Sequence, residues 1–129
     1  GIEAHGADIR ELLENATLGL FSLLCWHDAL AGQTEAVSER PIRVEAGSIE
    51  DVVVDWLNEV ITMGSAHGEL YRSVTVHDAN ERFAEGVLKG ELVDRDKHDL
   101  RFEVKAATYH ALSVARDENG ARVRVIFDL

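Results

Sequence analysis

Histidine side chains can bind a metal or transfer protons, and the chain has six of them. The six are His5, His27, His67, His77, His98 and His110. No two have the HxH or HxxxH spacing that places imidazoles on one face of a strand or helix. With Cys25 as the only cysteine, a structural zinc site would need scattered ligands. This spacing favours surface or hydrogen-bonded histidines over a metal centre.

Nucleophilic and nucleotide-binding motifs are also missing from the sequence. It contains no GxSxG, GxGxxG or GxxxxGK[ST] pattern. Cys25 lies in the apolar run LFSLLCW, where burial would raise the thiol pKa and keep the side chain reduced and inert. Ser113 and Thr108 lie near His110, but strand alternation would turn the residues next to His110 to the opposite face.

Carboxylates at the end of the chain form a different pattern. We interpret Asp51 with Asp55, and the Asp94–Asp99 segment, as helix caps and solvated loops. On a final strand that buries Phe127, Asp128 would point outward, one residue before the α-carboxylate of Leu129. Two adjacent carboxylates repel unless a cation lies between them, and their oxygens suit Ca²⁺ or Mg²⁺. A frayed, solvated chain end is the alternative.

The charge balance restricts the class of partner. The chain has 129 residues, 13 basic and 24 acidic, with a net charge of −11. Phosphate backbones would repel such a chain, so basic proteins or hard cations are better partners than nucleic acid. The longest apolar stretch, 18–26, is far below the roughly 20 residues needed to span a bilayer. With no targeting signal, we expect a cytoplasmic protein without a membrane partner.

Periodicity predicts the elements that must position these residues. Asp8 with Glu11, and Ser48 with Asp51, have the spacing of helix-capping boxes. We predict helices over 8–25 and from Ser48 to about Met63, with Trp56 buried. We predict strands at the chain start and over 36–45, 70–77, 83–92, 100–104, 109–116 and 121–127. Pro41 marks an edge strand, Gly86 and Gly90 mark bulges, and Asn119–Gly120 marks a hairpin. This order predicts a single α+β domain over 1–129, a mostly antiparallel β-sheet with two helices packed on one face.

Several segments together resemble the archease family. They are GIEAHGADIRELLENATLGLF (1–21), VVVDWLNEVI (52–61), GELVDRDKH (90–98), EVKAATYHALSV (103–114) and the terminal VIFDL (125–129). The resemblance extends over essentially the whole chain. It implies an archease-like fold and a protein cofactor of the RtcB-type RNA ligase of tRNA splicing and RNA repair. Such a cofactor is not an enzyme: it promotes guanylylation and multiple turnover of the ligase, which uses GTP and Mn²⁺.

The resemblance also implies a divalent cation, calcium in the family. Its ligands would be an Asp from an N-terminal HTAD motif, the penultimate Asp and the C-terminal residue, of which the last two correspond to Asp128 and Leu129. The HTAD motif would precede Gly1 and is absent here. His5–Asp8 is superficially similar, but we interpret Asp8 as a helix cap. We therefore expect an incomplete cation site in this chain.

Two other functions stay open on the sequence. One is a stand-alone metal-dependent phosphoester hydrolase that uses Asp128 with His110 or His98. The other is a chaperone-like adaptor domain that uses an apolar patch.

Overall fold

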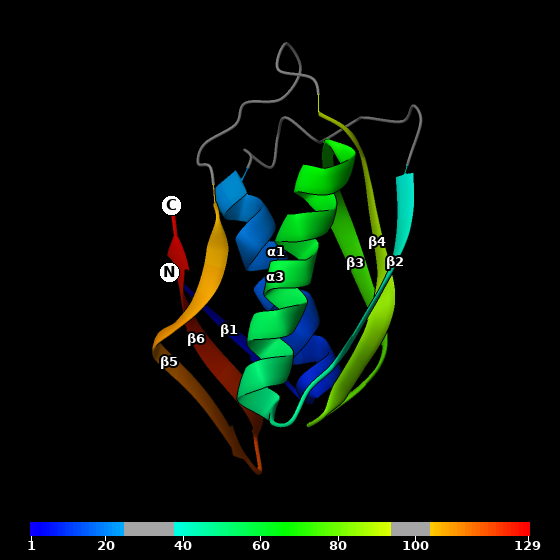
Figure 1. The fold of residues 1–129 in the computed structure, drawn as a ribbon. Helices are drawn as coiled ribbons and strands as arrows, with labels where there is room; N and C mark the ends of the chain where they lie inside the picture. Colours follow the sequence, from blue (N-terminus) through cyan, green and yellow to red (C-terminus); the bar gives the residue numbers. More distant parts are fainter. Residues whose placement is uncertain (25–37, 94–103) are drawn as a thin grey trace.

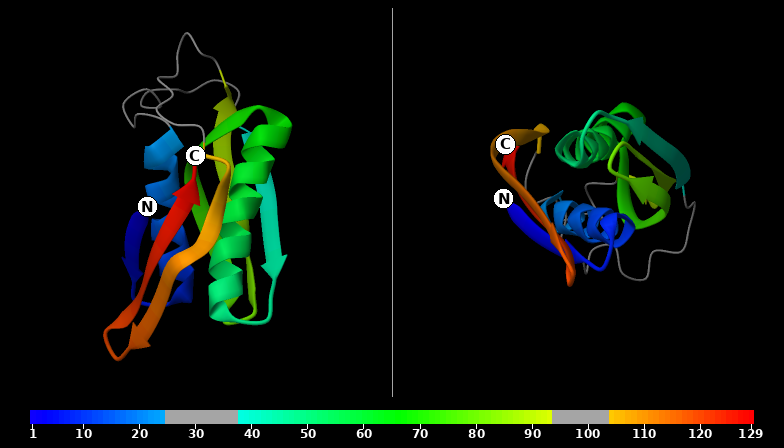
Figure 2. Two further views of the ribbon diagram at one scale, coloured as in Figure 1. Left: turned by 60° about the vertical axis from the view of Figure 1, so that its left-hand side comes forward. Right: turned by 90° about the horizontal axis from the view of Figure 1, so that it is seen from below.

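The described part of the fold consists of two helices between two antiparallel sheets (Figures 1 and 2). The computed structural model describes residues 1–24, 38–93 and 104–129. The helices are α1 (Ile9–Leu24) and α3 (Ile49–His67). One sheet has the order β1-β6-β5 and the other β2-β4-β3. The strands are β1 (Ile2–Gly6), β2 (Ser38–Glu45), β3 (Glu69–Asn80), β4 (Phe83–Leu92), β5 (Ala106–Asp117) and β6 (Gly120–Asp128).

The α+β class and the antiparallel pairing are confirmed. The strands nevertheless divide between two sheets, and the helices are covered on both sides. The β-branched run of α3 explains why. Val52, Val53 and Val54 are at most 1% exposed, and consecutive helical residues point about 100° apart, so this helix needs apolar neighbours on more than one side. The predictions for Cys25 and for the 94–99 loop lie outside the described residues, as does most of the predicted 100–104 strand.

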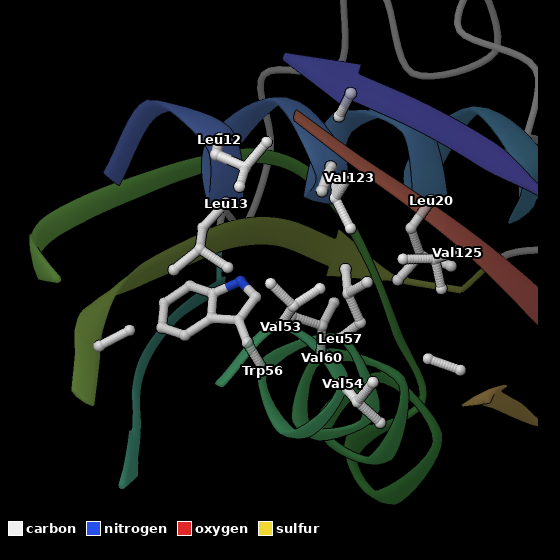
Figure 3. Packing of buried hydrophobic residues seen from close by; sticks show 14 of the residues in the cluster. Leu12, Leu13, Leu20, Val53, Val54, Trp56, Leu57, Val60, Val123 and Val125 are labelled. Atoms are coloured by element: carbon white, nitrogen blue, oxygen red, sulfur yellow. The ribbon is translucent and has the colours of Figure 1, made fainter. Parts of the chain in front are cut away.

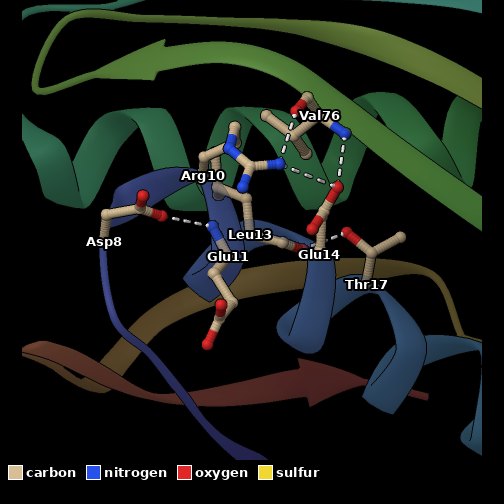
Figure 4. A network of polar contacts seen from close by, with 7 residues as sticks. All are labelled: Asp8, Arg10, Glu11, Leu13, Glu14, Thr17 and Val76. Atoms are coloured by element: carbon tan, nitrogen blue, oxygen red, sulfur yellow. Dashed lines mark hydrogen bonds and ion pairs between the residues drawn. The ribbon is translucent and has the colours of Figure 1, made fainter.

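Both predicted helix caps are confirmed. The Glu11 N–H donates to Asp8 Oδ1 at 2.8 Å (Figure 4), and the Asp51 N–H donates to Ser48 Oγ at 3.2 Å. Helix α3 continues past Met63 and ends at Gly68, whose φ of 63° suits glycine and whose N–H donates to the Gly64 carbonyl.

The predicted burial of Trp56 is confirmed, and its polar partner is on the other helix. Trp56 is fully buried among aliphatic side chains of both helices and of β6 (Figure 3). Its Nε1–H donates to Thr17 Oγ1 at 3.0 Å, and the Thr17 hydroxyl donates to the Leu13 carbonyl at 2.6 Å. A buried N–H without an acceptor is strongly unfavourable, so this contact fixes how α1 and α3 face each other.

Helix side chains bind the backbone of three outer strands. Arg10 and Glu14 of α1 bind the Val76 carbonyl and N–H of β3 at 3.3 and 2.8 Å (Figure 4). The Asn58 side chain of α3 binds both backbone groups of Ala107 in β5. The Asn15 amide of α1 donates to the His5 carbonyl of β1 at 2.6 Å. These contacts satisfy backbone groups that would otherwise need water or another strand.

The pairing of β3 with β4 is irregular at the two places where Gly86 and Gly90 predicted a bulge. The register of β3 against β4 shifts between Tyr71 and Ser73 and between Val76 and Asp78. Gly90 and Gly86 lie opposite these shifts. A Cβ atom on either glycine would come within about 2 Å of a β3 carbonyl oxygen, so only glycine fits. The extra residues are on β3, and the glycines are on its partner.

Two tyrosine hydroxyls and the Arg40 guanidinium make further side-chain contacts. Tyr109 of β5 donates to Asp51 Oδ1 of α3 at 2.5 Å. Tyr71 donates to Glu69 Oε1 at 2.9 Å, and Arg40 binds both oxygens of Glu69 at 2.9 and 3.0 Å. Hydrogen bonds from Arg40 lower the pKa of Glu69 to about 2. The hydrogen bond to Asp51 raises the pKa of Tyr109 to about 12, and burial, with the bond to Glu69, raises the pKa of Tyr71 further.

We predict that Trp56→Ala lowers the free energy of unfolding by about 3–5 kcal/mol, because it leaves a cavity between the helices and removes a buried hydrogen bond. Urea denaturation measures the change. The matched control is Leu18→Ala on the exposed side of α1, where the side chain is 37% exposed and we expect a change of about 0.5 kcal/mol. A loss below about 1 kcal/mol for Trp56→Ala would contradict this packing.

We also predict an alkaline titration without a normal tyrosine step. The chain has two tyrosines, and both pKa values are raised, so native protein should form little tyrosinate near pH 10 and show its first step near pH 12. A raised pKa stabilises the fold below the unfolded value of about 10, and this contribution is lost as pH rises through 12. Absorbance at the tyrosinate band, with and without urea, measures both states. A native step at pH 10 that Tyr109→Phe abolishes would refute the Asp51 contact.

Candidate functional site

The end of β6 carries the residues predicted to form the cation site. Phe127 is 8% exposed and packs in the core, whereas Asp128 is exposed, as strand alternation predicted. Leu129, the last residue, is exposed as well. Asp128 lies opposite Ala106 of β5, and the Lys105 N–H donates to the Asp128 carbonyl at 2.8 Å. We call Lys105, Asp128 and Leu129 the C-terminal tip. Pairing with β5 therefore holds the backbone of Asp128 while its carboxylate stays accessible.

The donor chemistry of the C-terminal tip fits a hard divalent cation only in part. The Asp128 side chain and the terminal carboxylate offer oxygens of the type Ca²⁺ binds, but Ca²⁺ takes 6–8 oxygen ligands. Among residues 1–24, 38–93 and 104–129, no group of three or more His, Cys, Asp or Glu side chains is placed to hold a metal ion. Any cation bound here would need water or further oxygens to complete its coordination.

Asp8 lies at the other end of β6, so it cannot complete the tip. Gly6 pairs with Ala121, which places Asp8 beside the start of β6. The strand from Ala121 to Asp128 spans roughly 23 Å at the usual rise per residue. Asp8 also uses its carboxylate to cap α1. The resemblance of His5–Asp8 to a ligand motif is thus superficial, as the sequence indicated.

The segment around His110 departs from regular strand geometry. The register of β5 shifts between Thr108 and Ser113, and Ala111 has a positive φ of 53°. Tyr109, His110 and Ala111 are all exposed, so the predicted alternation is wrong in this segment. The Thr108 hydroxyl donates to the Ile126 carbonyl at 2.9 Å and is therefore occupied.

No catalytic pair forms around this histidine. Within the described ranges, no hydrogen bond or ion pair joins His110 to Asp128, Ser113 or Thr108. His98, the other histidine considered for a hydrolase, lies outside the described residues. Among the residues that the structure describes, His110 is thus brought together with neither a nucleophile nor the carboxylate of Asp128.

The carboxylates of α3 have a structural use that the sequence did not reveal. Asp51 belongs to the first turn of the helix, as predicted, but its side chain also accepts the Tyr109 hydroxyl. Burial, with the nearby charge of Asp51, raises the pKa of Asp55. The pairing of Tyr109 with Asp51 joins residues 58 positions apart, and no local pattern signals it.

A cleft of about 890 Å³ lies at the end of the molecule away from the C-terminal tip. The start of α1, the β3–β4 turn and the β5–β6 turn line it. Its charged side chains have both signs, and Arg116 pairs with Glu81 across it at 2.6 Å. The cleft is thus separated from Asp128 by the length of β6.

None of the described helices is long and apolar enough to cross a membrane.

A family model and individual relatives both match this chain over most of its length. The model of the Archease protein family matches residues 1–129. The archease of Methanosarcina mazei is 26% identical over 130 residues, which cover 98% of this chain and 86% of the relative. The archease of Methanopyrus kandleri is 31% identical over 122 residues, covering 92% of this chain and 84% of the relative.

Solved structures share the fold. The solution structure of Methanobacterium thermoautotrophicum protein 1598 has a TM-score of 0.71 at 24% identity and covers 98% of this chain and 89% of its own. The crystal structure of an archease, titled a possible chaperone, from Thermotoga maritima has a TM-score of 0.65 at 23% identity and covers 99% and 88%. With the family model matching from the first residue to the last, this chain belongs to the archease family.

Proposed function

We propose that this protein is a non-catalytic cofactor of an RtcB-type RNA ligase and promotes the guanylylation and multiple turnover of that ligase in tRNA splicing and RNA repair. Membership of the archease family is the observation that carries the proposal. The single cysteine, which offers no internal disulfide, supports a cytoplasmic location.

We further propose that Asp128 and Leu129 bind a divalent cation, calcium by analogy with the family. When bound, the cation would supply positive charge and open coordination positions at an otherwise anionic tip. The protein's own part is to hold the Asp128 backbone against Lys105 while Phe127 anchors the strand in the core. This arrangement keeps a donor carboxylate in a fixed place and accessible from outside.

The charges of the two proteins indicate which surfaces would meet. A ligase active site that holds RNA ends and GTP must be cationic, and a chain of net charge −11 complements it. The same charge disfavours strong direct binding of nucleic acid. The acidic tip would therefore approach the ligase active site, and the RNA would contact the ligase.

A chaperone-like adaptor is the second candidate, because the Thermotoga archease of known structure is described as a possible chaperone. Such a function needs a contiguous apolar patch. The exposed large apolar side chains in the described residues are scattered over separate elements: Leu18 in α1, Leu92 in β4, Tyr109 in β5 and Leu129 at the tip. Isolated exposed apolar residues are ordinary in folded proteins. The arrangement favours the ligase cofactor.

We predict that Asp128→Ala abolishes stimulation of ligase guanylylation and turnover, because it removes the side-chain ligand of the tip. The side chain is exposed, so the free energy of unfolding should change by no more than about 0.5 kcal/mol. Single-turnover guanylylation and multiple-turnover ligation, with and without the protein, measure the effect.

Glu118→Ala is the matched control, since it removes an exposed carboxylate from the β5–β6 turn at the far end of the hairpin and should keep full activity. Asp128→Ala that melts normally and still stimulates the ligase fully would disprove the role of the tip.

We predict that an N-terminal extension carrying an acidic residue raises cation affinity about tenfold or more, because a third carboxylate adds to a site with too few oxygens. Ile2 pairs with Val125 in antiparallel register. An extension that continues β1 would therefore place its second residue before Gly1 opposite Asp128. Calorimetry with Ca²⁺ compares Asp, Asn and no extension. Equal affinities for all three chains would place the cation elsewhere.

A further inference from the structure

The outer face of the β1-β6-β5 sheet carries two arginines on its central strand. Arg122 and Arg124 are exposed and alternate with Val123 and Val125, which are buried in the core. We call this pair the arginine row. Figure 2 shows the helices against the other face of this sheet and no described element over the outer one. The arginine row is therefore accessible along its length.

Neither arginine takes part in holding the fold together. In the parts of the chain that the structure describes, Arg10, Arg40, Arg43 and Arg116 form ion pairs. Over the same residues, the arginine row has no ion pair and no side-chain hydrogen bond. Glu3 lies opposite Arg124 in the register but forms no ion pair with it. The chain has a net charge of −11, and yet these two guanidinium groups lie outside the ion pairs that the described residues form.

The neighbours of the arginine row leave room for a partner. On β5, the residues opposite Arg124 and Arg122 are Ser113 and Ala115, both small. On β1, His5 lies opposite Arg122. The small neighbours on β5 leave the guanidinium groups open on that side. Arginine can bind a carboxylate in bidentate fashion and is enriched among the residues that carry the binding energy of protein interfaces.

The position of the arginine row relative to Asp128 gives the surface an orientation. Arg122, Arg124 and Asp128 lie on the same side of β6, because their positions differ by even numbers. At the usual rise, the two arginines are roughly 7 Å apart and Asp128 is roughly 14 Å beyond Arg124. One strand thus presents cations at its middle and an anion at its end, and such a pattern fixes how two charged surfaces meet.

We propose that the arginine row docks on a carboxylate-rich surface of the ligase partner, beside the cationic site that receives the C-terminal tip; this rests on the proposed function. A protein surface suits this face better than RNA, because the net charge of −11 repels phosphate backbones.

The test measures the Kd of the double variant Arg122→Glu with Arg124→Glu for the purified ligase in the absence of RNA. We expect the Kd to rise about tenfold or more, with a weaker dependence on salt than for the unchanged protein. The matched control is Arg82→Glu, an exposed arginine in the β3–β4 turn, which has no ion pair among the described residues and should bind normally. Thermal melts verify that each variant folds, and Arg122→Lys with Arg124→Lys should bind between the two extremes, because lysine keeps the charge and loses the bidentate geometry.

An unchanged Kd for the double glutamate variant would overturn the proposal. So would a loss that occurs only when RNA is present, which would assign the arginine row to phosphate, or a halving of the mass in solution, which would assign it to contacts between copies. Stimulation by the unchanged protein separates the two proposals. If that protein neither binds nor stimulates the ligase, the proposed function fails; if it does both and the arginine variants match it, only the docking surface fails.

Discussion

The hydrogen bond from Trp56 to Thr17 joins the two helices at the centre of the molecule, and both sheets take their positions from that pair. The indole is fully buried, so its N–H must have a protein acceptor, and Thr17 in turn donates to the backbone of α1. Among the described residues no backbone ladder joins the two sheets, and an ion pair from Arg116 to Glu81 links their hairpins at one end. Their relative placement therefore depends on side chains, above all on those that pack on, or bind to, the helices between them.

Local signals in the sequence predicted the helix boundaries and the class of the fold. Asp8 and Ser48 are caps because a short polar side chain can reach an N–H three residues on, an interaction that depends on adjacent sequence only. The division into two sheets was not predictable in this way. It depends on which strands pair with β4 and which with β6, and pairing is decided between residues far apart in the chain. Val52–Val54 indicate the division, since three successive buried residues of a helix point to more than one side.

For the candidate site too, the local features could be predicted from the sequence and the contacts between distant residues could not. Alternation along the last strand was sufficient to turn Phe127 inward and Asp128 outward. Lys105 joins Asp128 only through the register of β5 with β6, which the sequence alone does not fix. The irregular stretch of β5 at His110 was missed for a related reason: a shift in register leaves no mark in a segment whose residue types all suit a strand.

The contacts between helix side chains and the outer strands also disfavour self-association of the protein. They are made by Asn15, Arg10, Glu14 and Asn58. Each binds backbone groups of an outer strand, and Pro41 removes an N–H from the fourth, β2. Two small open sheets would otherwise present templates on which a further strand, from another copy or from an unfolded chain, could add and start a growing fibre. With backbone groups engaged or missing on each outer strand, growth by strand addition is discouraged. Contacts with other macromolecules are left to the faces and ends of the sheets.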